Sequence, residues 1–221
     1  MKGVGYVSNS RLLDAMIAQS KLSKKQTEKQ QKIVETAIKL FAEKGYANTS
    51  TSEIAKAAGV AEGTIFRHYG TKDNLLLSVI LPFFKDSLPM MAEEVFKEVM
   101  SEKDTTFDEF LKALLKNRIE FFSANKEIFQ VVIKEILYNE ELKNELLPFL
   151  SENILPRLKS AVEHYQKQGE LKNIPSSQIV KMIITFFGGF IVSRFVLLNV
   201  DKISDLEIDH IVNFVLDGIN K

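Results

Sequence analysis

Residues 45–72, GYANTSTSEIAKAAGVAEGTIFRHYGTK, decide how the first part of this chain folds. Ser50 and Glu53 stand at the spacing of a capping box and predict a short helix over about residues 51–58. Gly59 ends this helix and permits a tight turn, after which a second helix of similar length begins. Two short helices joined by a glycine-containing turn indicate a helix-turn-helix, although an ordinary helical hairpin has the same spacing.

The second short helix, about residues 62–69, carries polar side chains suited to a DNA groove. Thr64, Arg67 and His68 lie on it among apolar residues, so these polar groups can face base edges while Ile65 packs inward. This division of the helix surface predicts a recognition helix for the major groove.

The charge distribution supports an anionic partner for this region. The chain of 221 residues is formally neutral, with 29 Lys plus Arg and 29 Asp plus Glu. Residues 1–80 nevertheless carry 12 basic against 7 acidic side chains, and residues 81–221 carry an acidic excess. A basic front on an acidic body favours nucleic acid as a partner, although chance clustering gives the same asymmetry.

The longer stretch of residues 33–76 resembles the DNA-binding domain of the tetracycline-repressor (TetR) family. The matching residues are numerous and occur at the family's spacing: Phe41, Gly45, Tyr46, Ser50, Ile54, Ala55, Ala58, Gly59, Val60, Gly63, Thr64, Phe66, Tyr69, Lys72 and Leu75. The likeness covers about a fifth of the chain. It implies a homodimeric transcriptional regulator, most simply a repressor, that binds a palindromic DNA operator and is released by a small effector.

Three residues depart from the family's usual pattern around the second helix. Ala61 stands where Ser or Thr often caps the helix, and the loss of such a cap costs about 0.5–2 kcal/mol. Glu62 brings a carboxylate that repels phosphate, although the helix dipole favours it locally. Phe66 lacks the hydroxyl of the commoner Tyr. These changes affect the expected DNA contacts but not the expected fold.

The resemblance implies roles for individual residues. Arg67 is the candidate for reading a guanine edge, and Lys72 is the candidate for a phosphate contact. His68 and Tyr69 either contact phosphate or pack the recognition helix, and Gly63 allows a close approach to DNA. The predicted DNA-binding set is Ser50, Thr51, Ser52, Gly63, Thr64, Phe66, Arg67, His68, Tyr69 and Lys72.

The rest of the chain shows apolar residues at helical spacing and predicts an all-α fold. A helix over about residues 27–44 precedes the motif. The later helices are expected over about residues 72–101 (kinked or split by Pro82 and Pro89), 106–123, 126–138, 140–168 (interrupted near Pro148 and Pro156), 176–198 (capped by Ser176) and 204–219.

Three segments are predicted from this pattern. Residues 1–25 form an extension that is either a mobile arm or a short accessory helix. Residues 26–72 form a three-helix DNA-binding domain that contains the helix-turn-helix. Residues 73–221 form a helical domain for effector binding and dimerisation.

The second domain is rich in residues that line adaptable apolar pockets. The chain contains 16 Phe and 6 Met, mostly after residue 80. Each candidate is also consistent with an ordinary core, and Arg118 either receives a ligand carboxylate or lies in solvent. As a set they predict an apolar, aromatic or lipid-like effector: Phe83, Phe84, Met90, Met91, Phe110, Leu114, Arg118, Phe121, Phe129, Ile133, Tyr138 and Phe187.

The last two helices are the expected dimer interface. The helix 176–198 is apolar on nearly all sides and contains Gly188 and Gly189, which permit close backbone approach. It can pack with the helix 204–219 against the same pair of a partner, although a purely intramolecular core is the alternative. Arg194 needs an acidic partner, expected across the interface. The predicted interface residues are Ile183, Phe186, Phe190, Arg194, Ile208, Ile211, Val212 and Val215.

Composition argues against other classes of function. The chain has no Cys and only three His, far apart, so no disulfide, metal or cofactor site is expected. No nucleophile–base pair or phosphate-binding glycine loop supports an enzyme. The alternative that stays open is a helical small-molecule-binding protein that has lost operator recognition.

The sequence also predicts a cytoplasmic protein without a membrane partner. The longest uncharged stretch, residues 182–193, is shorter than the about 18 residues that a membrane span requires. Residues 1–10 lack the apolar segment of a secretion signal.

Overall fold

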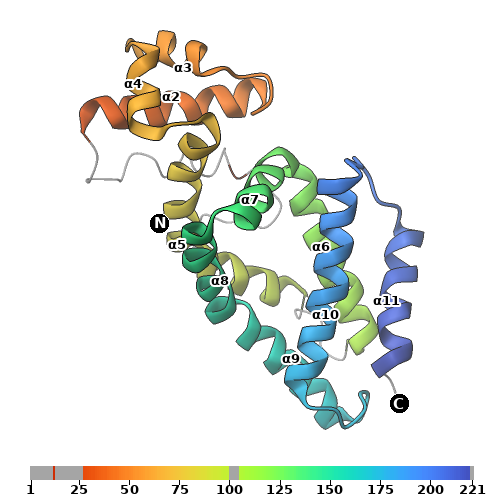
Figure 1. The fold of residues 1–221 in the computed structure, drawn as a ribbon. Helices are drawn as coiled ribbons and strands as arrows, with labels where there is room; N and C mark the ends of the chain where they lie inside the picture. The colour runs from red at the N-terminus through yellow and green to blue at the C-terminus, as the bar shows by residue number, and fades with distance from the viewer. Residues whose placement is uncertain (1–11, 13–26, 100–104, 220–221) are drawn as a thin grey trace.

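A computed structural model describes residues 12, 27–99 and 105–219 of the chain. Within these ranges the secondary structure is helical without a β-strand, which confirms the predicted all-α fold (Figure 1). The elements are α2 (Glu28–Lys44), α3 (Thr51–Ala58), α4 (Glu62–Tyr69), α5 (Lys72–Val99), α6 (Phe107–Ala124), α7 (Lys126–Tyr138), α8 (Glu140–Asn153), α9 (Leu155–Gln168), α10 (Ser176–Ile191), a π-helix (Val192–Leu197) and α11 (Asp205–Ile219).

Local capping explains why the first helices begin and end where they do. Thr27 and Gln30 form a capping box at the start of α2, because the Gln30 amide donates to Thr27 Oγ1 over 3.3 Å and the Thr27 amide donates to Gln30 Oε1 over 3.1 Å. Ser50 and Glu53 form the predicted capping box of α3. Gly59 ends α3 with a φ of 69°, a left-handed conformation that favours glycine.

The proline positions produced two differences from the prediction. The helix α5 is not split, because it continues through both Pro82 and Pro89. The expected 140–168 helix is interrupted at Ile154, near Pro156 as predicted, but not at Pro148, which lies inside α8. Proline is well tolerated in the first turn of a helix, where its missing N–H has no intrahelical partner, so Pro156 occupies the first turn of α9.

The expected 176–198 helix also differs at both ends. Pro175 occupies the cap position and the Ser176 hydroxyl donates to Glu163 Oε1 over 3.0 Å, so Ser176 does not cap the helix. After Ile191 the chain widens into the π-helix, which ends at Leu197.

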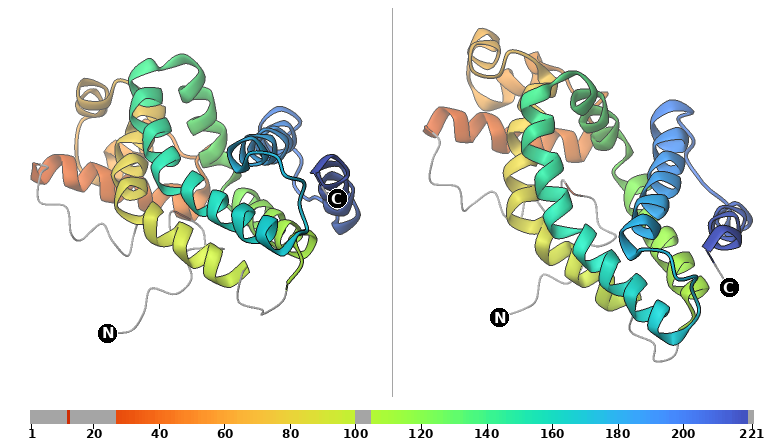
Figure 2. Two further views of the ribbon diagram at one scale, coloured as in Figure 1. Left: turned by 90° about the horizontal axis from the view of Figure 1, so that it is seen from below. Right: turned by 60° about the horizontal axis from the view of Figure 1, so that its bottom comes forward.

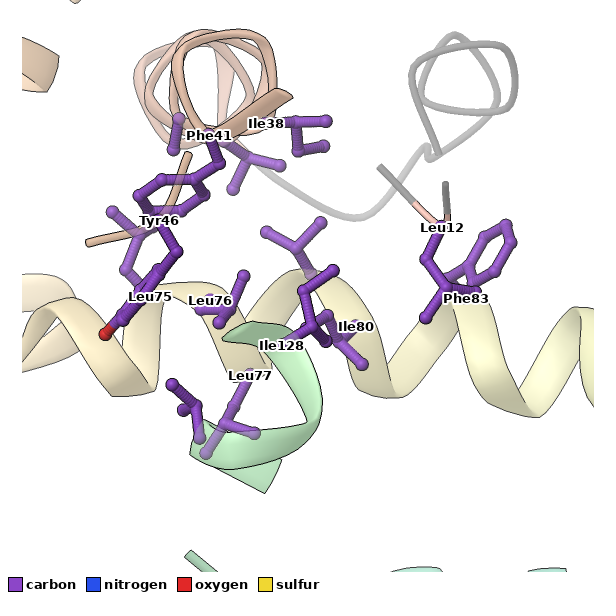
Figure 3. Packing of buried hydrophobic residues seen from close by; sticks show 14 of the residues in the cluster. Leu12, Ile38, Phe41, Tyr46, Leu75, Leu76, Leu77, Ile80, Phe83 and Ile128 are labelled. Atoms are coloured by element: carbon purple, nitrogen blue, oxygen red, sulfur yellow. The ribbon is translucent and has the colours of Figure 1, made fainter. Parts of the chain in front are cut away.

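The buried residues form two hydrophobic clusters. The helices from α6 to α11 are called the body here. The first cluster extends from α2, α3 and α4 through α5 into α7 and α8. Figure 3 shows Phe41 of α2 and Ile128 of α7 on different sides of the α5 side chains Leu75, Leu76 and Ile80. The second cluster joins α6, α9, α10 and α11 with the end of α5. The first cluster therefore connects the helix-turn-helix directly to the body.

The two views of Figure 2 and Figure 1 agree on the arrangement of these parts. The head, defined here as α2, α3 and α4, lies at one end of α5. The helices α10 and α11 lie side by side on the body, away from the head, and both contact α6.

The predicted extension, residues 1–25, lies outside the described residues except for Leu12. Leu12 is fully buried and belongs to the first cluster, near Phe83 of α5 (Figure 3). Its amide donates to Asn125 Oδ1 over 2.6 Å, at the corner between α6 and α7. Leu12 is therefore anchored against the body.

Candidate nucleic-acid interface

The two short helices of the head meet through small and branched apolar side chains. Ile54, Ala55 and Ala58 of α3 are buried, and Ile65 of α4 is fully buried in the same cluster. The short connection at Gly59 then turns α4 across α3. This packing leaves the remaining sides of α4 free to carry polar groups.

The residues predicted to face DNA on α4 are accessible. Arg67, His68 and Gly63 are exposed and Thr64 is half-buried. Phe66 is 48% exposed, which is unusual for an aromatic ring of this size and leaves its face available for a partner. Base reading by Arg67 and the other DNA contacts stay predictions.

Several predicted residues from different elements gather around one recess. A cavity of about 520 Å³ is lined by residues 47–51, Phe66 and residues 70–72. It therefore brings together Ser50, Thr51, Phe66 and Lys72, four of the ten residues proposed from the sequence. Ser52 is exposed near the start of α3 but does not line the recess.

Lys72 has a structural contact that the sequence did not reveal. Its ammonium donates to the carbonyl oxygens of Tyr46 over 2.9 Å and Thr49 over 3.0 Å, and it lies 4.2 Å from the centroid of the Tyr46 ring. Lys72 thus fixes the loop between α2 and α3 as well as presenting positive charge at the recess. The loop carbonyls have no residue-specific sequence signal, so the contact could not be predicted.

The hydroxyl of Ser50 is engaged in the capping box. It donates to Glu53 Oε2 and accepts from the Glu53 amide, each over 3.1 Å. Hydrogen bonds from the Ser50 backbone and then from Lys44 lower the pKa of Glu53 to about 2. Any phosphate contact by Ser50 must share the hydroxyl with this cap.

Tyr69 packs rather than pointing outward. Its ring contacts the first cluster, and its hydroxyl is buried without a hydrogen-bond partner among the described residues. Burial raises the pKa of Tyr69. Of the two roles predicted for this residue, the structure favours packing of the recognition helix.

The buried candidate pocket residues are divided between the two hydrophobic clusters. Of the buried members, Phe83, Met91, Phe121 and Phe129 belong to the first cluster, whereas Phe110, Leu114 and Phe187 belong to the second. Ile133 is half-buried, and the side chain of Phe84 lies outside the described part of the chain.

Three other candidates for the pocket are at least partly exposed. Tyr138 is 84% exposed and Met90 is 42% exposed, so neither side chain lines an enclosed pocket in this structure. Tyr138 is the last residue of α7, where the chain turns away from the core. Arg118 is half-buried, donates through Nε to Asn117 Oδ1 over 3.0 Å and lies 4.9 Å from the Phe121 ring.

The candidate interface residues also divide into two groups. Ile183, Ile208, Val212 and Val215 are buried inside the chain, so their side chains are not on its surface. They form the stripe that packs α10 and α11 into the second cluster. Phe186, Phe190 and Ile211 remain at least partly accessible.

Arg194 finds its acidic partner within the same chain. Its Nε donates to Glu207 Oε1 over 2.5 Å, and Nη2 contacts the same oxygen. The prediction of an ion pair across an interface is therefore corrected to a link between the π-helix and α11.

The exposed apolar face of these helices consists largely of residues that the sequence reasoning did not select. Phe186 and Phe214 pack edge to face with centroids 5.3 Å apart, and both rings are accessible. Met182, Ile184, Leu206, Leu197 and Leu198 are further exposed apolar residues of this part of the chain. The sequence signal that could have identified them is that these apolar residues lie outside the apolar stripe by which α10 and α11 pack into the second cluster.

The geometry defines a class of protein. A helix-turn-helix with an accessible polar recognition helix is joined to a set of further helices through the long helix α5 and the first cluster. An exposed second helix in such a motif is typical of DNA-binding proteins.

The comparison with protein families identifies the head more closely. Residues 33–79 match the family described as bacterial regulatory proteins, tetR family. This match confirms, for the DNA-binding domain, the resemblance seen in the sequence.

Individual relatives agree with this assignment. The uncharacterized HTH-type transcriptional regulator YuxN of Bacillus subtilis is 28% identical over 65% of this chain and 48% of its own length. The fatty acid metabolism regulator protein of the same organism is 32% identical over 42% of this chain and 46% of its own length. The matched region thus spans about half the length of these curated relatives.

The fold is shared with solved structures. The transcriptional regulator FadR from Bacillus subtilis, in complex with stearoyl-CoA, superimposes with a TM-score of 0.53 at 24% identity. The alignment covers 84% of this chain and 95% of that one.

Proposed function

We propose that this protein is a homodimeric transcriptional repressor that binds a palindromic DNA operator and is released by a small apolar effector. The observation that carries the proposal is the accessible face of α4 beside the recess of residues 47–51, Phe66 and residues 70–72. Arg67 reads base edges, while Ser52, Lys72 and the backbone amide of Thr51 hold the phosphate backbone.

The apolar face of α10 and α11 is proposed as the dimer interface. The segment Ser176–Leu197 is long and apolar enough to cross a membrane by length and composition alone, yet only 33% of its most apolar window is buried inside the chain. A second copy covers this face most simply, because a two-fold dimer presents two heads to a palindrome. The protein is then soluble in the cytoplasm, with no membrane partner.

The effector is proposed to be a lipid-like molecule. The buried part of the body is rich in Phe, including a contact group of Phe107, Phe110 and Tyr165 with ring centroids 5.2–5.9 Å apart. Such a core opens around an apolar ligand rather than a polar one. The solved relative from Bacillus subtilis that contains stearoyl-CoA supports the same ligand class.

Two polar contacts are proposed to transmit effector binding from the body to the head. Glu127 of α7 accepts hydrogen bonds from the amides of Tyr46 over 2.6 Å and Ala47 over 3.3 Å. Lys134 of α7 contacts Asp73 over 2.7 Å, and Asp73 accepts from the Tyr46 hydroxyl. A shift of α7 therefore pulls on the loop that precedes the helix-turn-helix.

The proposal is tested by binding to genomic fragments over a salt series, followed by footprinting of each retained fragment. The expected result is a protected two-fold site whose affinity falls steeply as salt rises. Sequence-blind binding by protein freed of co-purified ligand would overturn operator recognition. It would favour instead a helical small-molecule-binding protein that no longer reads DNA.

A further inference from the structure

A hydrogen bond joins the starts of the two helices of the motif. Thr51 Oγ1 donates to Glu62 Oε1 over 2.6 Å, although the two residues are 11 positions apart. Thr51 is the first residue of α3 and Glu62 is the first residue of α4. Both side chains are half-buried, so the contact lies at the seam between the two helices.

The position of this carboxylate is unusual for a surface that meets DNA. A negative charge is repelled by phosphates, and Glu62 weakens non-specific binding for this reason. Within the protein the charge is favoured, because the N-termini of α3 and α4 both carry positive partial charge and Thr51 supplies a hydroxyl donor. The fold thus holds an acidic group near the recognition surface.

The carboxylate retains hydrogen-bonding capacity. Thr51 Oγ1 is the one donor within reach of Glu62 among the described residues, and it contacts Oε1. An ionised carboxylate has two oxygens and accepts only. Oε2 therefore remains available to a donor outside the chain.

The bases of DNA offer few donors in the major groove. Cytosine presents its N4 amino group, whereas adenine presents N6 next to the acceptor N7. A carboxylate near adenine meets the N7 lone pair as well as the amino group, so adenine suits an amide side chain better. Cytosine is the base that matches an acceptor held in this way.

We propose that Glu62 is a specificity-determining residue that accepts a hydrogen bond from the N4 amino group of a cytosine in each operator half-site, and that Thr51 orients its carboxylate. This inference rests on the proposed function, because it concerns the same recognition helix. Glu62 and Arg67 then divide the reading between them, with the acceptor matched to cytosine and the guanidinium matched to guanine.

The test is selection of preferred sites from randomised DNA, together with affinities for the footprinted operator carrying each of the four bases in turn. The wild-type protein is expected to prefer cytosine by about tenfold at one position of each half-site. Glu62→Gln and Glu62→Ala should reduce this preference to about twofold or less while binding random DNA more tightly. Preferences at the other positions should not change.

Matched variants distinguish base reading by Glu62 from a general effect of its charge, and they test whether Thr51 orients its carboxylate. Glu35→Gln removes the same charge from the exposed surface of α2 and should leave every base preference as in the wild type. Thr51→Val should lower the cytosine preference, and Thr51→Ser, which keeps the hydroxyl, should restore it. A Thr51→Val protein that retains the full cytosine preference would overturn the orienting role.

Two results distinguish the failure of this inference from the failure of the proposed function. A wild-type protein that protects a two-fold operator but shows the same base preferences as Glu62→Gln, or prefers adenine at the affected position, would overturn cytosine reading alone. A wild-type protein that protects no operator would overturn both. Thermal unfolding of each variant checks that a lost preference does not reflect a lost fold.

Discussion

The head and the body of this protein reach their folds by different means. In the head, the two helices of the motif have eight residues each, and helix ends are fixed by capping boxes at Thr27 and Ser50 and by a left-handed glycine at Gly59. The body has local caps as well, at Thr106 and Gly169, but the positions of its helices depend on packing in two clusters. In the head, individual residues therefore have local tasks, whereas in the body the tasks are shared by many side chains.

The largest effect is expected in the body. Phe110 is fully buried and its ring contacts Phe96, Phe107 and Tyr165. Phe110→Ala should lower the free energy of unfolding by about 3–5 kcal/mol, because it leaves a cavity in the second cluster. Chemical unfolding measures this change. Leu137→Ala, at a side chain that is 71% exposed, is the control and should be nearly neutral; equal effects would contradict the difference in packing.

The second-largest effect on stability is expected at Gly45, the glycine that follows α2. Gly45 ends α2 with a φ of 85°, and a Cβ atom there would lie 3.3 Å from Glu127 Oε2. Gly45→Ala should destabilise the protein by about 1–3 kcal/mol, because alanine rarely adopts this backbone conformation. Thermal unfolding checks the prediction.

Gly63 is the matched control for this substitution. It lies within α4, and a Cβ atom there would meet nothing within 4 Å. Gly63→Ala should leave the fold intact or stabilise it slightly, while it weakens operator binding by obstructing close approach of DNA. An unfolded Gly63→Ala protein would contradict this separation of folding from reading.

Arg67 and Lys72 separate two kinds of DNA contact within the head. Arg67→Ala should weaken operator binding by about 1–3 kcal/mol and relax base preference. Lys72→Ala should weaken operator and random DNA alike and lower the salt slope by about one. Binding across a salt series measures both quantities. If Arg67→Ala weakened both DNAs equally, base reading by Arg67 would be excluded.

The smallest effect concerns acid. Hydrogen bonds from Ser50 and Lys44 lower the pKa of Glu53 from 4.5 to about 2 in the folded head. Because the pKa of Glu53 is lower in the folded protein than in the unfolded chain, its ionised carboxylate stabilises the fold at pH values above the unfolded pKa. This contribution disappears as pH falls from about 4.5 towards about 2. Glu53→Gln should therefore flatten the loss of stability over this range. The measurement is stability as a function of pH, monitored by circular dichroism. The same pH dependence in the wild type and in Glu53→Gln would show that this carboxylate does not stabilise the fold.

The sequence predicted the helices of the head closely because their signals are local. The boundaries expected at about residues 51–58 and 62–69 are those of α3 and α4. Contacts between distant residues could not be predicted, because periodicity does not say which faces meet. Thr51 with Glu62, Lys72 with the loop carbonyls and Glu127 with Tyr46 are of this kind.

The burial of several predicted interface residues has a related physical reason. Ile208, Val212 and Val215 lie on the most regular apolar stripe of α11, and such a stripe fills the chain's own core first. Leu206 and Phe214 are apolar residues outside that stripe, and they remain exposed. Residues left over after the core is assigned are the better candidates for an interface.

The continuity of α5 has a mechanical consequence. A helix of 28 residues is about 42 Å long, so each degree of tilt displaces one end relative to the other by about 0.7 Å. Two copies that tilt in opposite senses would change the spacing of their heads by as much as about 1.5 Å per degree, against a half-site repeat of about 34 Å. A rotation of a few degrees could thus disengage the heads from DNA without melting a single helical turn. Distances between spin labels on the two heads would register such a movement, whereas far-ultraviolet circular dichroism would not.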